Sequence, residues 1–102
     1  MTLGSTSPFR PTGTTGVAAG TTSTNITLAG GGDSIVITNT TASLAYIRFG
    51  SDLTVTASAS DMPVLPNSRA MLSINSLITT AAALLISGSG TVLFTRGDGS
   101  FL

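Results

Sequence analysis

Short apolar runs separated by turn-forming residues recur along the chain from residue 25 onward. Such runs, rich in β-branched side chains and bounded by Gly, Asn, Asp, Ser or Pro, are typical of β-strands. They predict strands over residues 25–28, 34–38, 44–49, 62–66, 69–74, 80–86 and 91–96, with a weaker edge strand over 53–59. The run Ala-Ala-Ala-Leu-Leu within residues 80–86 also has high helix propensity. The threonines before it and the Ser-Gly repeat after it favour a strand.

Alternation within these runs assigns side chains to an inward face. Successive residues of a strand point to opposite faces of the sheet, so every second side chain points into the core. The residues predicted to face the core are Ala45, Ile47, Phe49, Ala70, Leu72, Ile74, Val92 and Phe94. The prolines of residues 62–66 place that run at a sheet edge or in a connection. Roughly six to eight short strands predict an all-β domain over residues 25–102, a small antiparallel β-sandwich or barrel.

Residues 1–24 have a different character, because Gly, Thr and Ser dominate and no periodicity runs through them. We expect an extended N-terminal arm that contributes nothing to the core. Phe9 stands between two prolines and is an apolar anchor in an extended segment. Phe9, Arg10 and Pro11 are therefore the residues predicted to bind a partner. The alternative is a terminus without fixed structure.

The composition limits which kinds of catalytic and metal-binding site the chain can form. The chain of 102 residues has no His, Cys, Trp, Lys or Glu, and its charged side chains are four arginines and four aspartates. Nucleophilic catalysis by a Ser–His, Cys–His or Ser–Lys pair is excluded because the base is missing. Disulfides and thiolate metal sites are excluded as well. Asp33, Asp52, Asp61 and Asp98 stand in predicted turns, where Asp is common for local hydrogen bonding. We expect no enzyme activity and no cofactor.

Four short motifs carry little weight. The triple glycine of residues 30–32 lacks the Gly-Lys-Ser/Thr ending of a phosphate loop and is expected to form a hairpin turn. Residues 25–27 and 39–41 match the glycosylation sequon, but no secretory signal precedes them. Arg96-Gly97-Asp98 spells an adhesion tripeptide, expected as an exposed turn with a weak local ion pair. Residues 98–100 are only a fragment of a calcium loop.

The net charge and the size of the chain indicate which kinds of partner it binds. The net charge is zero and the four arginines are scattered, so nucleic acid is not an expected ligand. No apolar run approaches the length of a membrane-spanning helix, and residues 1–20 do not resemble a signal peptide, so we expect assembly in a cytoplasm. A small domain without disulfides and with a mean hydropathy of +0.48 favours oligomerisation or docking on a larger assembly.

The chain contains the segments IVITNTT, AYIRFGS, DMPVLPNSR and GSGTVLFTRGDG, at residues 35–41, 45–51, 61–69 and 88–99. These segments resemble small virion structural proteins of tailed bacteriophages. The resemblance spans about residues 24 to 100, and by size and composition it is greatest to capsid decoration (cement) proteins. It implies a non-enzymatic protein that docks on the major capsid protein at the outer capsid surface and reinforces the shell. It also implies a homo-oligomer, with a trimer favoured, and an arm that grips capsid subunits.

Two other classes of function remain as alternatives. The first is a receptor- or glycan-binding module of a phage fibre or tail, although the single Tyr and four Phe fall mostly in predicted strands. The second is a hydrolase that uses a pair of aspartates.

Overall fold

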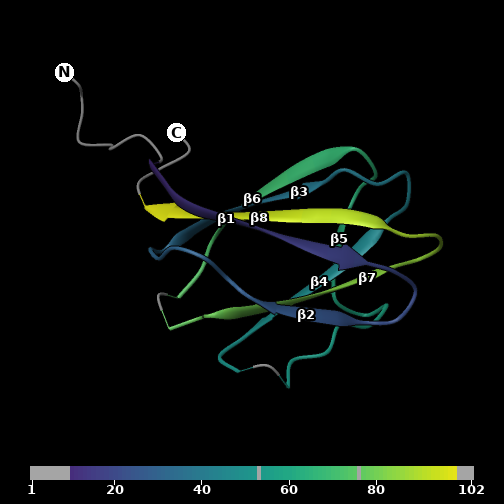
Figure 1. The fold of residues 1–102 in the computed structure, drawn as a ribbon, viewed down its shortest axis with the longest axis horizontal. Coiled ribbons are helices and arrows are strands. Elements are labelled where there is room, and N and C mark those ends of the chain that lie inside the picture. The colour runs from purple at the N-terminus through teal and green to yellow at the C-terminus, as the bar shows by residue number, and fades with distance from the viewer. Residues whose placement is uncertain (1–9, 53, 76, 99–102) are drawn as a thin grey trace.

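The computed structural model describes residues 10–52, 54–75 and 77–98. Within them the chain forms eight strands and no helix (Figure 1). The strands are β1 (Arg10–Ala19), β2 (Thr24–Thr27), β3 (Ser34–Asn39), β4 (Ala45–Gly50), β5 (Met62–Val64), β6 (Ser68–Ser73), β7 (Thr80–Leu85) and β8 (Gly90–Asp98). The described residues therefore include no helix that could cross a membrane.

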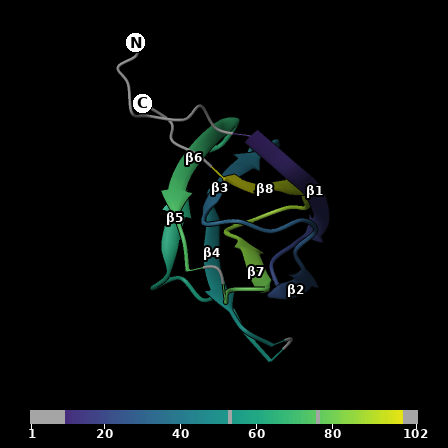
Figure 2. The same ribbon diagram turned by 90° about the vertical axis from the view of Figure 1, so that its left-hand side faces the viewer.

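The strands form two antiparallel sheets of four, which pack face to face. The first sheet has the order β1-β8-β3-β6 and the second the order β2-β7-β4-β5. Figure 2 shows the first sheet as the upper layer and the second as the lower layer. Every connection except that between β4 and β5 changes sheet. Eight strands wound in this way form a jelly-roll sandwich, so of the two expected architectures the sandwich is confirmed.

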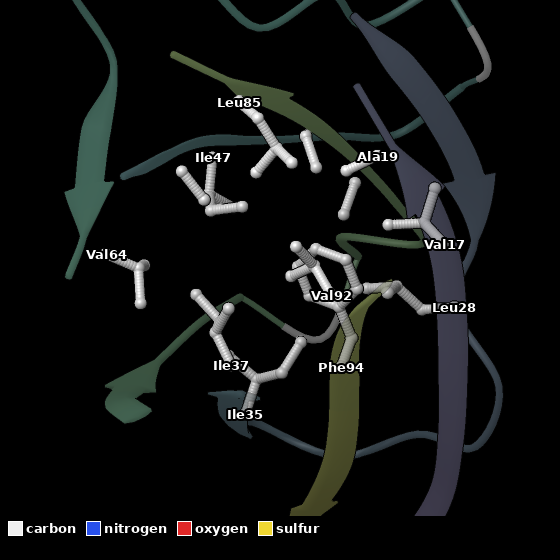
Figure 3. Close-up of a cluster of buried hydrophobic side chains, with 13 residues drawn as sticks. Val17, Ala19, Leu28, Ile35, Ile37, Ile47, Val64, Leu85, Val92 and Phe94 are labelled. Atoms are coloured by element: carbon white, nitrogen blue, oxygen red, sulfur yellow. The ribbon is translucent and has the colours of Figure 1, made fainter. Parts of the chain in front are cut away.

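The predicted strands and inward faces are largely confirmed. Within the predicted run 80–86 the chain forms the strand β7 over Thr80–Leu85 and not a helix, and β5 with Pro63 lies at the edge of the second sheet. The core fills the space between the sheets (Figure 3). Phe94 in this core meets Phe49 edge to face, with ring centroids 6.2 Å apart. The buried members of this core are Val17, Ala19, Leu28, Ile35, Ile37, Ala45, Ile47, Val64, Ala81, Ala83, Leu85, Val92 and Phe94. Ala70, Leu72 and Ile74 pack against it.

The expectation that the chain contributes nothing to the core before residue 25 is wrong for residues 10–19. They form β1, which pairs with β8 along its length, and Val17 and Ala19 are buried. The sequence does not reveal this strand because its first half is rich in Gly and Thr and shows no apolar alternation. This half is held in the sheet by backbone pairing with β8. A bulge between Pro11 and Gly13 interrupts the register. The first nine residues of the expected arm lie outside the described residues.

The weak edge strand expected over residues 53–59 is also not formed; Leu53 itself lies outside the described residues. Residues 54–59 follow an irregular path whose backbone groups bond to side chains. The Ala57 amide donates to Ser23 Oγ at 2.9 Å, and the Val55 carbonyl accepts from Asn25 Nδ2 at 3.4 Å. Because β5 occupies the edge beside β4, no edge position there is left for another strand.

Candidate docking surface

The three residues predicted to bind a partner are only partly described. Arg10 and Pro11 are the first residues of β1, and Phe9 lies outside the described residues. Arg10 is exposed and its Nε lies 3.1 Å from Asp98 Oδ1 at the end of β8. Pro11 stands opposite Gly97 in the register. Both residues thus begin the sheet instead of belonging to a separate arm, and whether they bind a partner stays a prediction.

The adhesion tripeptide is not the exposed turn that the sequence suggested. Arg96 follows Val92 and Phe94 on the inward face of β8 and is only 2% exposed. Its guanidinium donates to the carbonyls of Gly32 at 2.8 Å, Asn75 at 3.3 Å and Ile78. Burial lowers the pKa of Arg96 below its ordinary value. Asp98 pairs with Arg10 and not with Arg96, so the tripeptide is part of the fold.

Two of the four aspartates accept local hydrogen bonds. Asp61 accepts from the Ser58 amide at 2.7 Å, and its carboxylate lies 3.6 Å from the Arg48 guanidinium. Asp52 accepts from the Thr54 amide at 3.0 Å and from the Thr54 hydroxyl. Asp33 is exposed just before β3. Among the described residues no three of these side chains gather into a group that could hold a metal ion.

From the hydrogen bonds of Asp52 we expect the folded protein to lose a small part of its stability in acid. Its hydrogen bonds from Thr54 lower its pKa below the ordinary 3.8. A carboxylate with a lowered folded pKa stabilises the protein above its unfolded pKa, and the contribution is lost as pH falls through the folded value. We expect the difference in urea midpoint between the wild type and Asp52→Asn to shrink below about pH 4. Urea unfolding at pH 7 and pH 3 measures it; a difference that is independent of pH would contradict this role.

The triple glycine does not close a hairpin, because it lies on the connection from β2 in one sheet to β3 in the other. Gly32 has φ of +121° and approaches β8 so closely that a Cβ there would lie 2.1 Å from the Gly97 carbonyl oxygen. Only glycine fits this position. The glycines thus serve the close packing of a connection against β8, beside the carbonyl that receives Arg96.

The outer face of the first sheet presents side chains from all four of its strands. The register aligns two rows of outward side chains across its four strands. One row is Thr14, Thr95, Val36 and Met71; the other is Gly16, Leu93, Thr38 and Arg69. The hydroxyls of Thr14 and Thr95 lie 3.0 Å apart, across β1 and β8. We call these eight residues the open face.

The outer face of the second sheet differs because a connection covers part of it. Ala82 points away from the core by alternation, yet it is 1% exposed. It stands opposite Asn25 in the register, and Asn25 bonds to Val55 of the irregular segment. Ala57 of the same segment is buried as well. Residues 54–59 therefore shield this sheet, and nothing described does the same for the open face.

The open face is almost uncharged. Of its eight residues only Arg69, on the edge strand β6, carries a charge. Met71 beside it is 57% exposed, which is unusual for a large apolar side chain. A surface made mostly of threonine and aliphatic side chains, with a single charge, suits contact with another protein. The open face cannot be recognised in the sequence because its rows depend on which strands are neighbours. The alternation of Thr91, Leu93 and Thr95 is the local signal that the sequence offers.

Two shallow grooves lie at one end of the sandwich. The larger, about 490 Å³, is lined mainly by small and hydroxyl residues from the β1–β2 and β7–β8 connections. The smaller, about 320 Å³, lies between the end of β3 and the start of β6 and includes Asn39, Asn67 and Arg69. Neither groove is lined by an aromatic side chain.

Comparison of the chain with known protein families, with curated proteins and with solved structures gives no match.

Proposed function

We propose that the protein is a non-enzymatic structural protein of a bacteriophage virion, which decorates the capsid and reinforces it. The observation that carries this proposal is the contrast between the two sheets. One outer face is shielded by residues 54–59, whereas the open face carries a single charge and is covered by no described segment. On this proposal the open face lies against the major capsid protein at the outer surface of the head.

The physical chemistry of a shell supports this function. A capsid presents the same surface many times, so weak contacts repeated by symmetry give strong total binding. A neutral face needs no matching charges on its partner and is little affected by salt. The jelly-roll sandwich also occurs in viral capsid and lectin domains. That likeness is an analogy at the level of fold and carries less weight than the surface itself.

Particles with and without the protein test the reinforcing role. We expect virions that lack it to lose infectivity faster on heating and osmotic shock, because the contacts between capsid subunits lose their bridges. Adding the purified protein back should restore resistance. Equal resistance of the two kinds of particle would exclude reinforcement.

A charge placed in the open face tests the docking surface. Thr95→Arg puts a cation at the centre of a neutral contact, and we expect it to weaken binding to stripped particles at least about tenfold. Thr27→Arg makes the same change on an outward position of β2 and is expected to bind as the wild type does. Co-sedimentation with particles measures both. Equal binding of the two variants would show that another surface docks.

The grooves favour glycan binding as a second candidate function. Hydroxyl groups of Thr21, Thr22 and Ser89 line the larger one and suit hydrogen bonding to a sugar. A receptor-binding module of a fibre or tail would bind host surface glycans without any capsid. Finding only a few copies of the chain, at the tail tip, would favour this function over decoration.

A further inference from the structure

The four arginines differ in whether their side chains already have partners. Arg10 and Arg48 pair with aspartates, and Arg96 is buried against carbonyls. Arg69 on β6 is exposed, and among the described residues its side chain makes no ion pair and no hydrogen bond. It lines the smaller groove, which has a volume of about 320 Å³. This groove therefore contains a guanidinium whose donors are available to a ligand.

Two further side chains with open hydrogen-bonding groups line the same groove. Thr38 of β3 stands directly opposite Arg69 in the register, so their Cβ atoms lie on one face of the sheet, within about 5.5 Å of each other. Asn67 comes two residues before Arg69, just outside β6. Within the described part of the chain neither the Thr38 hydroxyl nor the Asn67 carboxamide makes a hydrogen bond. A guanidinium, a hydroxyl and a carboxamide thus converge on one hollow.

The backbone of Asn67 adopts a conformation that its own side chain does not stabilise. Its φ is +51°, and no other non-glycine residue of the described ranges has a positive φ. The backbone N–H of Asn67 donates to the Thr41 carbonyl at 3.0 Å, which fixes this turn. Residues in sparsely populated backbone conformations are common at ligand-binding sites. Because the backbone sets the conformation, the carboxamide is in position before a ligand binds.

These groups indicate the class of ligand. A guanidinium binds a carboxylate through two parallel hydrogen bonds, and hydroxyl and carboxamide groups both donate to and accept from the hydroxyls of a sugar. One arginine matches the single charge of a carboxylate but only part of the charge of a phosphate group. We propose that the groove binds an acidic sugar, a uronic acid, with its carboxylate on Arg69 and its ring hydroxyls on Asn67 and Thr38.

The position of the smaller groove lets a longer glycan continue into the larger one. Thr40 lines the smaller groove and Thr91 the larger, and the Thr40 hydroxyl donates to the Thr91 carbonyl, so the two grooves are neighbours. The inference rests on the second candidate function, glycan binding, and names the class of glycan. Thr38 and Arg69 also belong to the open face, so a protein docked there would cover them. The sugar therefore binds the undocked protein.

Isothermal titration of the full chain with a trisaccharide of galacturonic acid tests the proposal. We expect Arg69→Gln to weaken binding at least about tenfold, because the carboxylate loses its two charged hydrogen bonds. Arg10→Gln is the matched control, since Arg10 lies at the opposite end of the first sheet, and it should bind within about twofold of the wild type. The uncharged methyl ester of the trisaccharide should bind the wild type at least about tenfold more weakly than the acid.

The ways in which this titration can fail have different meanings. Equal binding of Arg69→Gln and the wild type would overturn the site. Equal binding of the acid and its ester would overturn the acidic class of sugar and leave glycan binding in place, whereas no binding of either would overturn both. A triglutamate peptide that binds as tightly as the trisaccharide would overturn the assignment to a sugar. Capsids are absent from the titration, so decoration does not depend on its result.

Asn67→Gly separates a binding role of this side chain from a structural one. Glycine adopts a positive φ without strain, so we expect the melting temperature to stay within about 4 °C of the wild type. Affinity for the acidic trisaccharide should fall about threefold, because the carboxamide is lost. Thermal unfolding followed by circular dichroism and the same titration measure the two effects. Unchanged affinity, or a large loss of stability, would overturn the role of Asn67 in the site.

Discussion

Replacing Arg96 by methionine is expected to lower the free energy of unfolding by about 3 kcal/mol, because at least three carbonyls lose their donor at once. The guanidinium of Arg96 joins the β2–β3 connection at Gly32 to the β6–β7 connection at Asn75 and Ile78. Methionine fills a similar volume, so the loss reports the hydrogen bonds more than a cavity. In a small domain this is a large part of the total stability.

Urea unfolding followed by circular dichroism measures the effect of Arg96→Met. Arg10→Met is the matched control, because Arg10 is exposed and its ion pair with Asp98 is expected to contribute about 0.5 kcal/mol or less. Arg96→Lys keeps the charge but loses the planar fork, and should fall between the two. Equal stability of Arg96→Met and Arg10→Met would show that the buried arginine does not hold the connections.

The second large effect is expected at Asn39, which is 1% exposed. Its Nδ2 donates to the carbonyls of Ser43 at 2.8 Å, Val64 at 3.1 Å and Leu65 at 3.2 Å. Its Oδ1 accepts from the Thr41 amide at 3.0 Å and from the Thr41 hydroxyl at 2.7 Å. This one side chain therefore fixes the β3–β4 connection against the end of β5.

We expect Asn39→Ala to lower the free energy of unfolding by about 3 kcal/mol, since several buried polar groups lose their partners. Asn75→Ala is the control, because that exposed side chain accepts a single local hydrogen bond from the Leu77 amide, and we expect it to cost less than about 1 kcal/mol. The two variants are compared by urea unfolding. If they lost the same stability, the Asn39 network would not be what orders this end of the sandwich.

The sequence predicted the strands whose apolar alternation is strong. Ile35 and Ile37 of β3, and Val92 and Phe94 of β8, alternate with more exposed residues and face the core as a period of two requires. For these elements local pattern and tertiary packing agree. The number of strands and the sandwich followed from them, because many short strands bounded by turn residues have few compact arrangements.

What the sequence did not reveal depends on contacts between distant residues. Arg10 stands opposite Asp98, so β1 exists only because the two ends of the described chain pair. Arg96 was expected in an exposed turn because its tripeptide ends a predicted strand and is followed by Gly99 and Ser100 in the sequence. The connections at Gly32 and Ile78 supply the carbonyls that permit its burial. In the sequence Asn39 was assigned to a predicted turn, where asparagine is common. The local pattern does not reveal its network, because partners of its side chain lie in another sheet.

The open face was hidden for the same reason. Thr14, Thr95 and Met71 lie in three separate segments, and only the strand order brings them into one row. The proposed function therefore rests on a property of the fold and on the resemblance together. The open face is the surface on which we propose that the partner binds.

Cryo-electron microscopy of purified virions that carry the gene for this chain tests the central claim most directly. Decoration predicts density for the sandwich at repeated positions on the outer surface of the head, with the open face of the first sheet turned toward the capsid protein. Density only at the tail, or a head-bound protein whose open face is turned to solvent, would contradict it.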